Sequence, residues 1–306
     1  MMKKTASIAG VLLALALAVP AFPGTIPSSI VPEGARWVAH LDMEKFVATK
    51  LYEFLDKDGR FEIKKRDIDR WLQIDPAKDI TGVTVFGFEP GGKGQIVVAV
   101  AGKFDKARLL TLLDLAEDHT ETPYGAYTVH STGDDGYGAF INDGLIVLSE
   151  DRMAVEKVLD TAGGKLKNFA GSALNASLKD VPASAFLSGV LPNLSALSEM
   201  NSQSKILEKA SGLFFLAQEK QDALQLRLQV TADTPENAKN MADLVQGLIA
   251  MGRLGGNEGD MARIASVLDG LQVKLDGKVL RLDFERPSRE IADLLKMGRG
   301  FHGLFD

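Results

Sequence analysis

The stretch INDGLIVLSEDRMAVEKVL (residues 141–159) has a counterpart further along the chain, KLDGKVLRLDFERPSREIADLL (residues 274–295). Each stretch contains an apolar strand, an Asp-Gly turn, a second apolar strand, a charged break and the start of an amphipathic helix. Asp-Gly between two alternating apolar runs is a strong hairpin signal, because a type I′ turn needs positive φ at both central positions. The chain therefore contains two similar hairpin–helix units.

A second pair of segments precedes these hairpins at a similar spacing. DITGVTVFGFE (79–89) matches KASGLFFLAQE (209–219), with Gly82 and Gly212 130 positions apart (212 − 82), against 133 for the Asp-Gly turns (276 − 143). In each copy another strand and then a helix follow, at 95–102 with 104–118 and at 223–232 with 234–252. We therefore predict an internal duplication. Each copy would contain, in this order, a strand, a helix, a hairpin, a second helix, further strands and a third helix.

Runs of strands interrupted by single helices indicate an α+β fold with largely antiparallel sheets. We expect a pseudo-two-fold relation between the copies, as two lobes or as two halves of one body. The short linker, which has apolar residues of its own, favours close packing of the copies. The predicted boundaries are a signal peptide at 1–21, a first repeat at 31–162, a linker at 163–182, a second repeat at 183–298 and a C-terminal tail at 299–306.

The helix predicted at 234–252 has a clear start signal. Thr234 is an expected N-cap, and Pro235 occupies the first helical position, where its missing N–H costs nothing. Helical spacing places five apolar residues on one face: Met241, Leu244, Val245, Leu248 and Ile249.

The N-terminus predicts export. Lys3 and Lys4 precede an unbroken apolar run, and Val19 and Ala21 occupy the −3 and −1 positions of a signal-peptidase site. The alternative is an uncleaved anchor helix over 5–22. The chain has no cysteine, which excludes a thioether-linked lipid anchor and disulfides. We expect a periplasmic or extracellular bacterial protein with no stable membrane span after signal cleavage.

Composition excludes several partners. The chain has a net charge of −6 without a basic cluster, which argues against nucleic acid and against docking on anionic lipid. A hydrophobic fraction of 45% over 306 residues is ample for a folded core.

Apparent catalytic motifs are incomplete, so we predict no catalytic residues and no cofactor. GFEPGGKG (87–94) resembles a phosphate loop but lacks the final hydroxyl residue and precedes a strand instead of a helix. DKDGRFEIKKRD (56–67) lacks the ligands of a calcium loop. SQSK (202–205) has the Ser-x-x-Lys spacing of penicillin-recognising enzymes without their companion motifs.

No two of the four histidines lie at i, i+4, so we predict no metal site from their spacing. His40 and Asp42, at the end of the first predicted strand, are candidate binding residues. A hydrolase would need both to meet a third polar group in a cleft. The alternative is that Asp42 caps the following helix and that His40 is half-buried.

The first copy carries about 19 extra residues, because Trp37 and Phe186 are 149 positions apart (186 − 37) where the next anchors are 130 apart. This surplus lies near 57–77 and contains three further candidate binding residues: Arg66, Arg70 and Trp71. We hypothesise that the segment contacts a protein partner. The alternative is a longer surface helix with apolar residues turned inward.

VPEGARWVAHLDMEKFVATKLYEFL (31–55) places a strand before an Asp and a helix. With the duplicated pattern downstream, it resembles uncharacterised exported bacterial proteins built from tandem α+β repeats. The resemblance covers most of the mature chain and implies no functional residues. The sequence favours a non-enzymatic envelope protein that acts by binding another envelope protein. The alternative is a periplasmic carrier of an apolar or amphipathic small molecule, held between the repeats.

Overall fold

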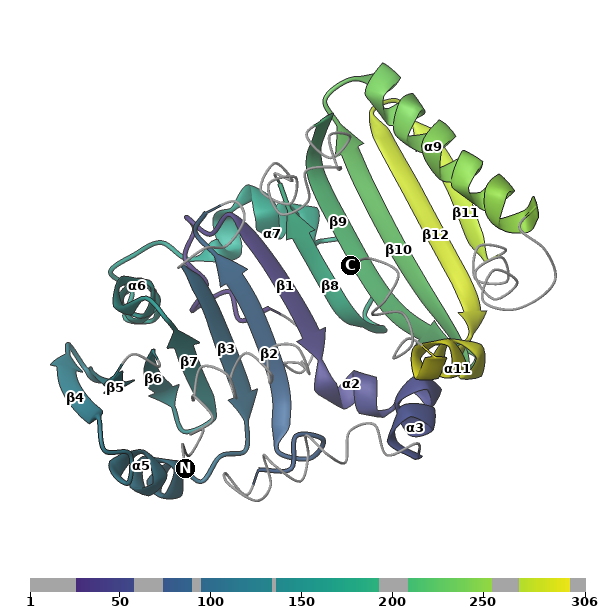
Figure 1. The fold of residues 1–306 in the computed structure, drawn as a ribbon. Helices are drawn as coiled ribbons and strands as arrows, with labels where there is room; N and C mark the ends of the chain where they lie inside the picture. Colours follow the sequence, from purple (N-terminus) through teal and green to yellow (C-terminus); the bar gives the residue numbers. More distant parts are fainter. Residues whose placement is uncertain are drawn as a thin grey trace, which may run out of the picture. The chain divides into compact units, whose positions relative to one another are not determined.

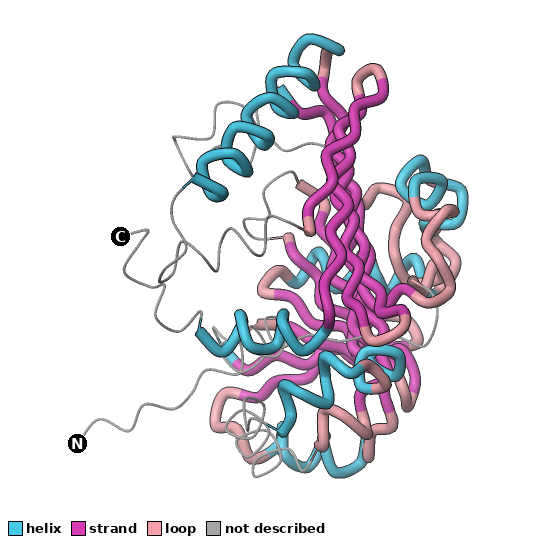
Figure 2. Tube along the Cα trace, turned by 90° about the vertical axis from the view of Figure 1, so that its right-hand side faces the viewer, coloured by secondary structure: helices cyan, strands magenta, loops and turns pink. Residues whose placement is uncertain are grey.

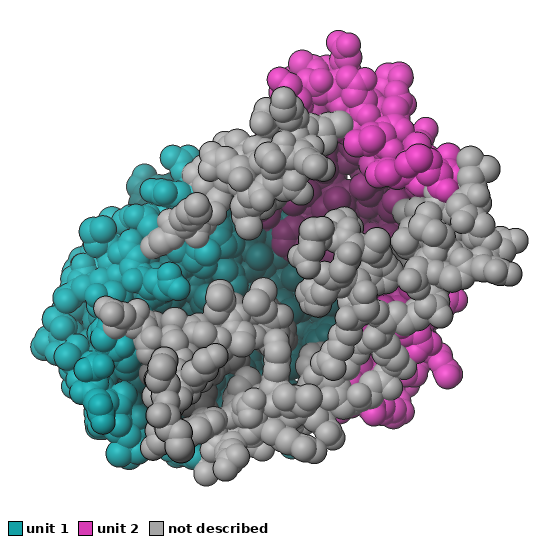
Figure 3. Space-filling view, in the orientation of Figure 1, with its two compact units in different colours: residues 1–47, 62–189 teal, residues 48–61, 190–306 magenta. Residues whose placement is uncertain are grey.

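The computed structural model describes residues 26–57, 74–89, 95–133, 136–192, 209–254 and 270–297. The chain divides into two compact units, which Figure 3 draws in different colours. Unit 1 comprises residues 1–47 and 62–189, and unit 2 comprises residues 48–61 and 190–306.

Unit 1 is built on a sheet whose strands follow the order β8-β1-β2-β3-β7-β6-β5-β4 (Figure 1). The strands are β1 Trp37–Asp42, β2 Ile80–Gly87, β3 Ile96–Gly102, β4 His119–Tyr124, β5 Tyr127–Thr132, β6 Tyr137–Asn142, β7 Leu145–Ser149 and β8 Ala185–Leu191, whose last two residues belong to unit 2. From β1 to β4 every neighbouring pair is antiparallel.

The core of unit 1 lies under α6 (Arg152–Ala162), which contacts β3, β6 and β7. Asp151 caps this helix by accepting a hydrogen bond from the backbone N–H of Met153 at 2.8 Å. Strand and helix side chains are fully buried there: Val38, Phe86, Val97, Val147, Val155 and Val158. The other helices that the structure describes in unit 1 are α2 Met43–Val47, α5 Lys106–Asp114, the short 3₁₀ turn Phe169–Gly171 and α7 Ala173–Ser177.

Unit 2 contains the strand order β11-β12-β10-β9, again with antiparallel pairs. Its elements are α3 Lys50–Lys57, β9 Ala210–Lys220, β10 Ala223–Ala232, α9 Pro235–Leu254, β11 Leu271–Asp276, β12 Val279–Pro287 and α11 Ser288–Met297. The predicted α+β class with a large antiparallel sheet is thus confirmed. Among the helices that the structure describes, none is both long and apolar enough to cross a membrane.

Helix α9 runs along one face of the strands of unit 2 (Figure 2). It begins as predicted, because Thr234 Oγ1 accepts a hydrogen bond from the Asn237 N–H at 3.1 Å. The buried face agrees with the predicted one only in part, because Met241 and Ile249 are buried but Leu248 is 49% exposed. Met241 is buried beside the alanines Ala238 and Ala242, whereas Leu244 is 50% exposed. Small side chains let the helix approach the sheet closely, which turns the larger leucines away from it.

Both predicted Asp-Gly hairpins form, as β6–β7 and β11–β12. Neither has the positive φ at both Asp and Gly that the predicted type I′ turn requires, although Gly277 alone has a φ of 55°. Asp143 and Gly144 have no positive φ, and the Asn142 side chain instead accepts a hydrogen bond from the Gly144 N–H at 2.9 Å. Positive φ at both central residues occurs in the β9–β10 hairpin, at Gln221 (49°) and Asp222 (60°). The type I′ prediction was wrong at Asp143-Gly144 because a turn closed by the Asn142 side chain competes with the type I′ turn at the same residues.

Candidate metal centre

The candidate binding residues of the first strand have structural roles. Asp42 Oδ1 accepts a hydrogen bond from the Lys45 N–H at 2.9 Å, which caps α2, and its Oδ2 lies 2.8 Å from Lys45 Nζ. His40 is buried, with Nδ1 3.1 Å from Thr84 Oγ1. Asp42 therefore caps the helix, as the alternative interpretation expects. A hydrolase in which Asp42 and His40 meet a third polar group in a cleft is not supported. Arg66, Arg70 and Trp71 lie outside the described residues.

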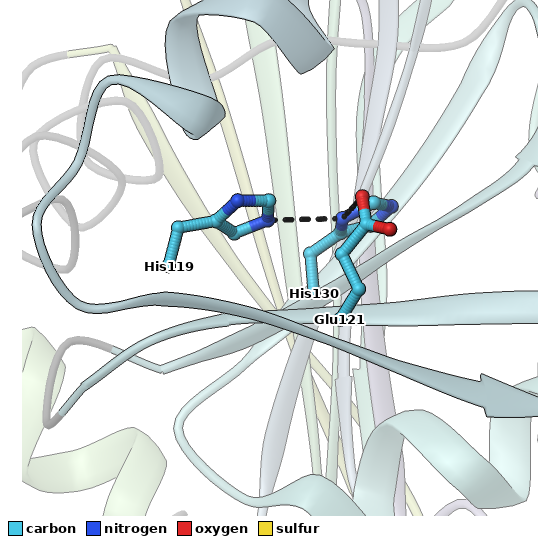
Figure 4. A group of neighbouring side chains, drawn as sticks. All are labelled: His119, Glu121 and His130. Carbon is cyan, nitrogen blue, oxygen red and sulfur yellow. Dashed lines mark hydrogen bonds and ion pairs between the residues drawn. The ribbon is translucent and has the colours of Figure 1, made fainter.

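A different group of side chains meets on the β4–β5 hairpin (Figure 4). Glu121 pairs directly with His130 across the two strands, so both side chains point to the same face. His119 lies two residues before Glu121 on β4 and shares that face, because side chains alternate along a strand. The two strands of this hairpin, β4 and β5, thus bring three potential metal ligands together.

Three donor atoms of this group, which we call the histidine site, converge. His119 Nε2 lies 3.2 Å from His130 Nδ1, and His130 Nδ1 lies 3.4 Å from Glu121 Oε1. All three lie within 4.8 Å of one another. A tetrahedral ion with ligands at about 2.0–2.1 Å separates neighbouring ligands by about 3.3–3.4 Å. The two contacts therefore already match the spacing that such an ion requires.

Asp114, the last residue of α5, orients His119 from behind. Its Oδ1 lies 3.1 Å from His119 Nδ1, the ring nitrogen that faces away from His130. An Nδ1–H that donates to this carboxylate leaves the lone pair of His119 on Nε2, where it faces His130. In metal sites, a carboxylate commonly contacts the far ring nitrogen of a ligating histidine and fixes the orientation of the ring. Asp114 is thus placed to favour the tautomer in which His119 Nε2 is free to bind a metal ion.

The two imidazoles are sheltered while the carboxylates reach solvent. The side chains of His119 and His130 are 7% and 9% exposed, and that of Glu121 is 54% exposed. Burial lowers the pKa of His130, a change that Glu121 partly offsets and that the neighbouring His119 and Lys106 reinforce. The neutral imidazole, which is the metal-binding form, is therefore favoured at neutral pH.

Phe140 and Lys106 complete the surroundings of the site. The Phe140 ring stands edge-on to His130, with ring centroids 6.1 Å apart. Lys106 Nζ lies 5.4 Å from the centre of the same Phe140 ring, and 3.5 Å from the exposed Asp143. The site therefore has an apolar wall and a cation beside it.

The sequence contains a signal for this group that a search for helical histidine pairs misses. HTETPYGAYTVH (119–130) places His119 and Glu121 at alternate positions before a Tyr-Gly turn. If Tyr124 pairs with Tyr127 across that turn, as it does in the structure, Glu121 must pair with His130. Ligand spacing on a hairpin follows this register and not the i, i+4 rule of helices.

No family model matches the sequence, and no curated protein matches it. Solved structures of TP0453, a Treponema envelope protein, are similar in fold. Crystal form III has a TM-score of 0.52 and 8% sequence identity, and the match covers 89% of this chain and 98% of that chain. Crystal form IV has a TM-score of 0.52 and 10% identity, with 88% and 96% covered. At such identities the likeness concerns the fold alone.

Proposed function

We propose that this chain is an exported bacterial binding protein, without catalytic activity, whose ligand is a divalent transition-metal ion held at the histidine site. The convergence of His119 Nε2, His130 Nδ1 and Glu121 Oε1 carries the proposal. Imidazole nitrogens favour Zn²⁺, Cu²⁺ or Ni²⁺ over Mg²⁺ and Ca²⁺, which prefer oxygen ligands. An ion bound there would take the place of the direct 3.2 Å contact between His119 Nε2 and His130 Nδ1.

The exported address is supported by the N-terminal segment 1–21, with its basic start, apolar run and small residues at the cleavage positions. The fold likeness to TP0453, an envelope protein, is in keeping with this address. Contact of the segment 57–77 with a protein partner stays a prediction, as does an apolar ligand between the repeats.

We also propose that the two units descend from one duplicated unit, as the paired hairpins predict. In unit 1 a hairpin (β2–β3), a helix, a hairpin (β6–β7) and a helix follow one another, and β7 pairs with β3. In unit 2 the hairpin β9–β10, α9, the hairpin β11–β12 and α11 follow in the same order, and β12 pairs with β10. The same chain order and the same strand pairing support the duplication.

Equilibrium dialysis of the chelator-treated mature chain, residues 22–306 without a histidine tag, tests the proposal. We expect one Zn²⁺ per chain, and at least 100-fold weaker binding in His119→Gln and in His130→Gln. Glu121→Gln should weaken binding about tenfold or more. Because Glu121 is 54% exposed, this variant should keep its fold even if the buried His130 cannot be replaced.

Glu117→Gln provides the matched control, because this exposed carboxylate lies in the turn between α5 and β4 and is not part of the ligand group. Zn²⁺ affinity should be unchanged in this variant. Absence of stoichiometric Zn²⁺ in the wild-type chain, or full affinity in both His119→Gln and Glu121→Gln, would refute the proposal.

A further inference from the structure

The number of protein ligands at the histidine site distinguishes two kinds of metal centre. Structural zinc sites have four protein ligands, whereas sites that bind external molecules have three and keep one position open. Among the described residues, the ligand group comprises His119, Glu121 and His130. Asp114 does not provide a fourth ligand, because its carboxylate contacts the far nitrogen of His119.

We propose, resting on metal binding at the histidine site, that the fourth position of the bound ion is open and captures a small anion from solution. The chain then binds its anionic ligand only when it is loaded with metal. The anion completes the tetrahedron as a monodentate ligand, and no covalent bond in it is made or broken.

Exposure places the open position on the Glu121 side of the ion. The His119 and His130 rings are 7% and 9% exposed, so the protein encloses the ion on their side. Glu121, 54% exposed, provides the ligand nearest to solvent. A solute can therefore reach the ion beside this carboxylate without displacing either imidazole.

Charge favours an anion over a neutral donor at that position. A divalent ion with two neutral imidazoles and one carboxylate keeps a net charge of about +1, which the Asp114 carboxylate beside His119 offsets only in part because it is 67% exposed to solvent. Lys106 adds a second positive charge, because its ammonium lies over the Phe140 ring that borders His130. Its carboxylate partner, Asp143, is 3.5 Å away with an 89% exposed side chain, so it offsets little of that charge at the site.

Co²⁺ is a suitable probe, because its visible spectrum reports the number and type of its ligands. Azide, a small monodentate anion, is titrated into the Co²⁺-loaded mature chain while the absorption bands are recorded. We expect a saturable spectral change with one azide per Co²⁺, and no azide binding by the metal-free chain in calorimetry. Lys106→Gln should weaken azide binding about three- to tenfold, as expected for the loss of one nearby charge. The same variant should bind Co²⁺ at least as tightly as the wild type, because it removes a positive charge near the cation.

Glu117→Gln serves again as the control and should bind both Co²⁺ and azide as the wild type does. Stoichiometric Co²⁺ binding with a spectrum that azide does not alter would overturn the open position and leave the proposed function intact. Azide binding by the metal-free chain would overturn the inference in the same way. Absence of Co²⁺ and Zn²⁺ uptake would overturn the proposed function itself, and the inference with it.

Discussion

At the scale of single residues, Asp283 of β12 is a carboxylate paired with three cationic side chains of unit 2. It accepts hydrogen bonds from Arg227 Nε at 2.9 Å, Arg281 Nε at 2.9 Å and Lys274 Nζ at 3.2 Å. Burial raises the pKa of Asp283, but the three cationic donors outweigh it and bring the pKa to about 2. Arg227 stands directly opposite on β10, so strand register creates the cluster.

This lowered pKa predicts an acid-dependent loss of stability. A carboxylate with a depressed folded-state pKa stabilises the fold above its unfolded pKa, 3.8, and loses that contribution as the pH falls towards about 2. Because the donors are partly exposed, we expect about 1–2 kcal/mol at neutral pH. Urea unfolding of the wild type and of Asp283→Asn should therefore differ by this amount at pH 7.

The difference between the two proteins should shrink between pH 4 and pH 2. Asp143→Asn, which removes a carboxylate whose side chain is 89% exposed, should show almost no difference at any pH. A gap between wild type and Asp283→Asn that stays constant down to pH 2 would contradict the assignment.

At the scale of elements, a single carboxylate joins two helices of unit 2. The Glu219 side chain on β9 accepts hydrogen bonds from the backbone N–H groups of Lys50 at 2.7 Å and Leu51 at 3.0 Å, at the start of α3. It also accepts one from the hydroxyl of Ser288, the first residue of α11. An acidic group at a helix N-terminus satisfies backbone donors that the helix itself cannot satisfy.

Removal of this charge should loosen α3 in particular. We expect Glu219→Gln to destabilise unit 2 by about 1–3 kcal/mol, the range for hydrogen bonds to a charged group. In hydrogen exchange, the amides of α3 should lose protection before those of α9. Glu53→Gln, which removes an exposed carboxylate paired with Lys50 and Lys57 on the same helix, should leave both helices unchanged. Equal exchange in both variants would show that Glu219 does not hold α3.

Sequence patterns predicted the elements better than their side-chain contacts. Alternation and Asp-Gly turns located the hairpins, and the Thr234 cap located the start of α9, because these signals are local. The predictions failed for Leu244 and Leu248 of α9 and for the turn type at Asp143, because packing against the sheet and a competing side-chain bond decide them. The histidine site depends on the register between β4 and β5, which a search for local motifs does not consider.

At the scale of the whole molecule, metal binding should stabilise unit 1 selectively, because His119, Glu121 and His130 all belong to it. Free Zn²⁺ at 100 times its dissociation constant stabilises a protein by about 2.7 kcal/mol. We expect Zn²⁺ to increase hydrogen-exchange protection in β4 and β5 and to leave α9 unchanged.

Protection should not change when Zn²⁺ is added to His119→Gln. Equal protection of β4 and α9 by Zn²⁺ in the wild type would indicate that the ion binds elsewhere.

Residues 48–61 precede most of unit 1 in the chain but belong to unit 2. Lys50 is separated from its hydrogen-bond partner Glu219 by 169 positions. At a synthesis rate of about 5–20 residues per second, α3 leaves the ribosome roughly 8–34 s before that carboxylate exists. The newborn chain must therefore carry Leu51 and Leu55, both buried in the finished protein, without their final partners for that interval. Such a delay makes this segment a natural binding target for chaperones during biogenesis.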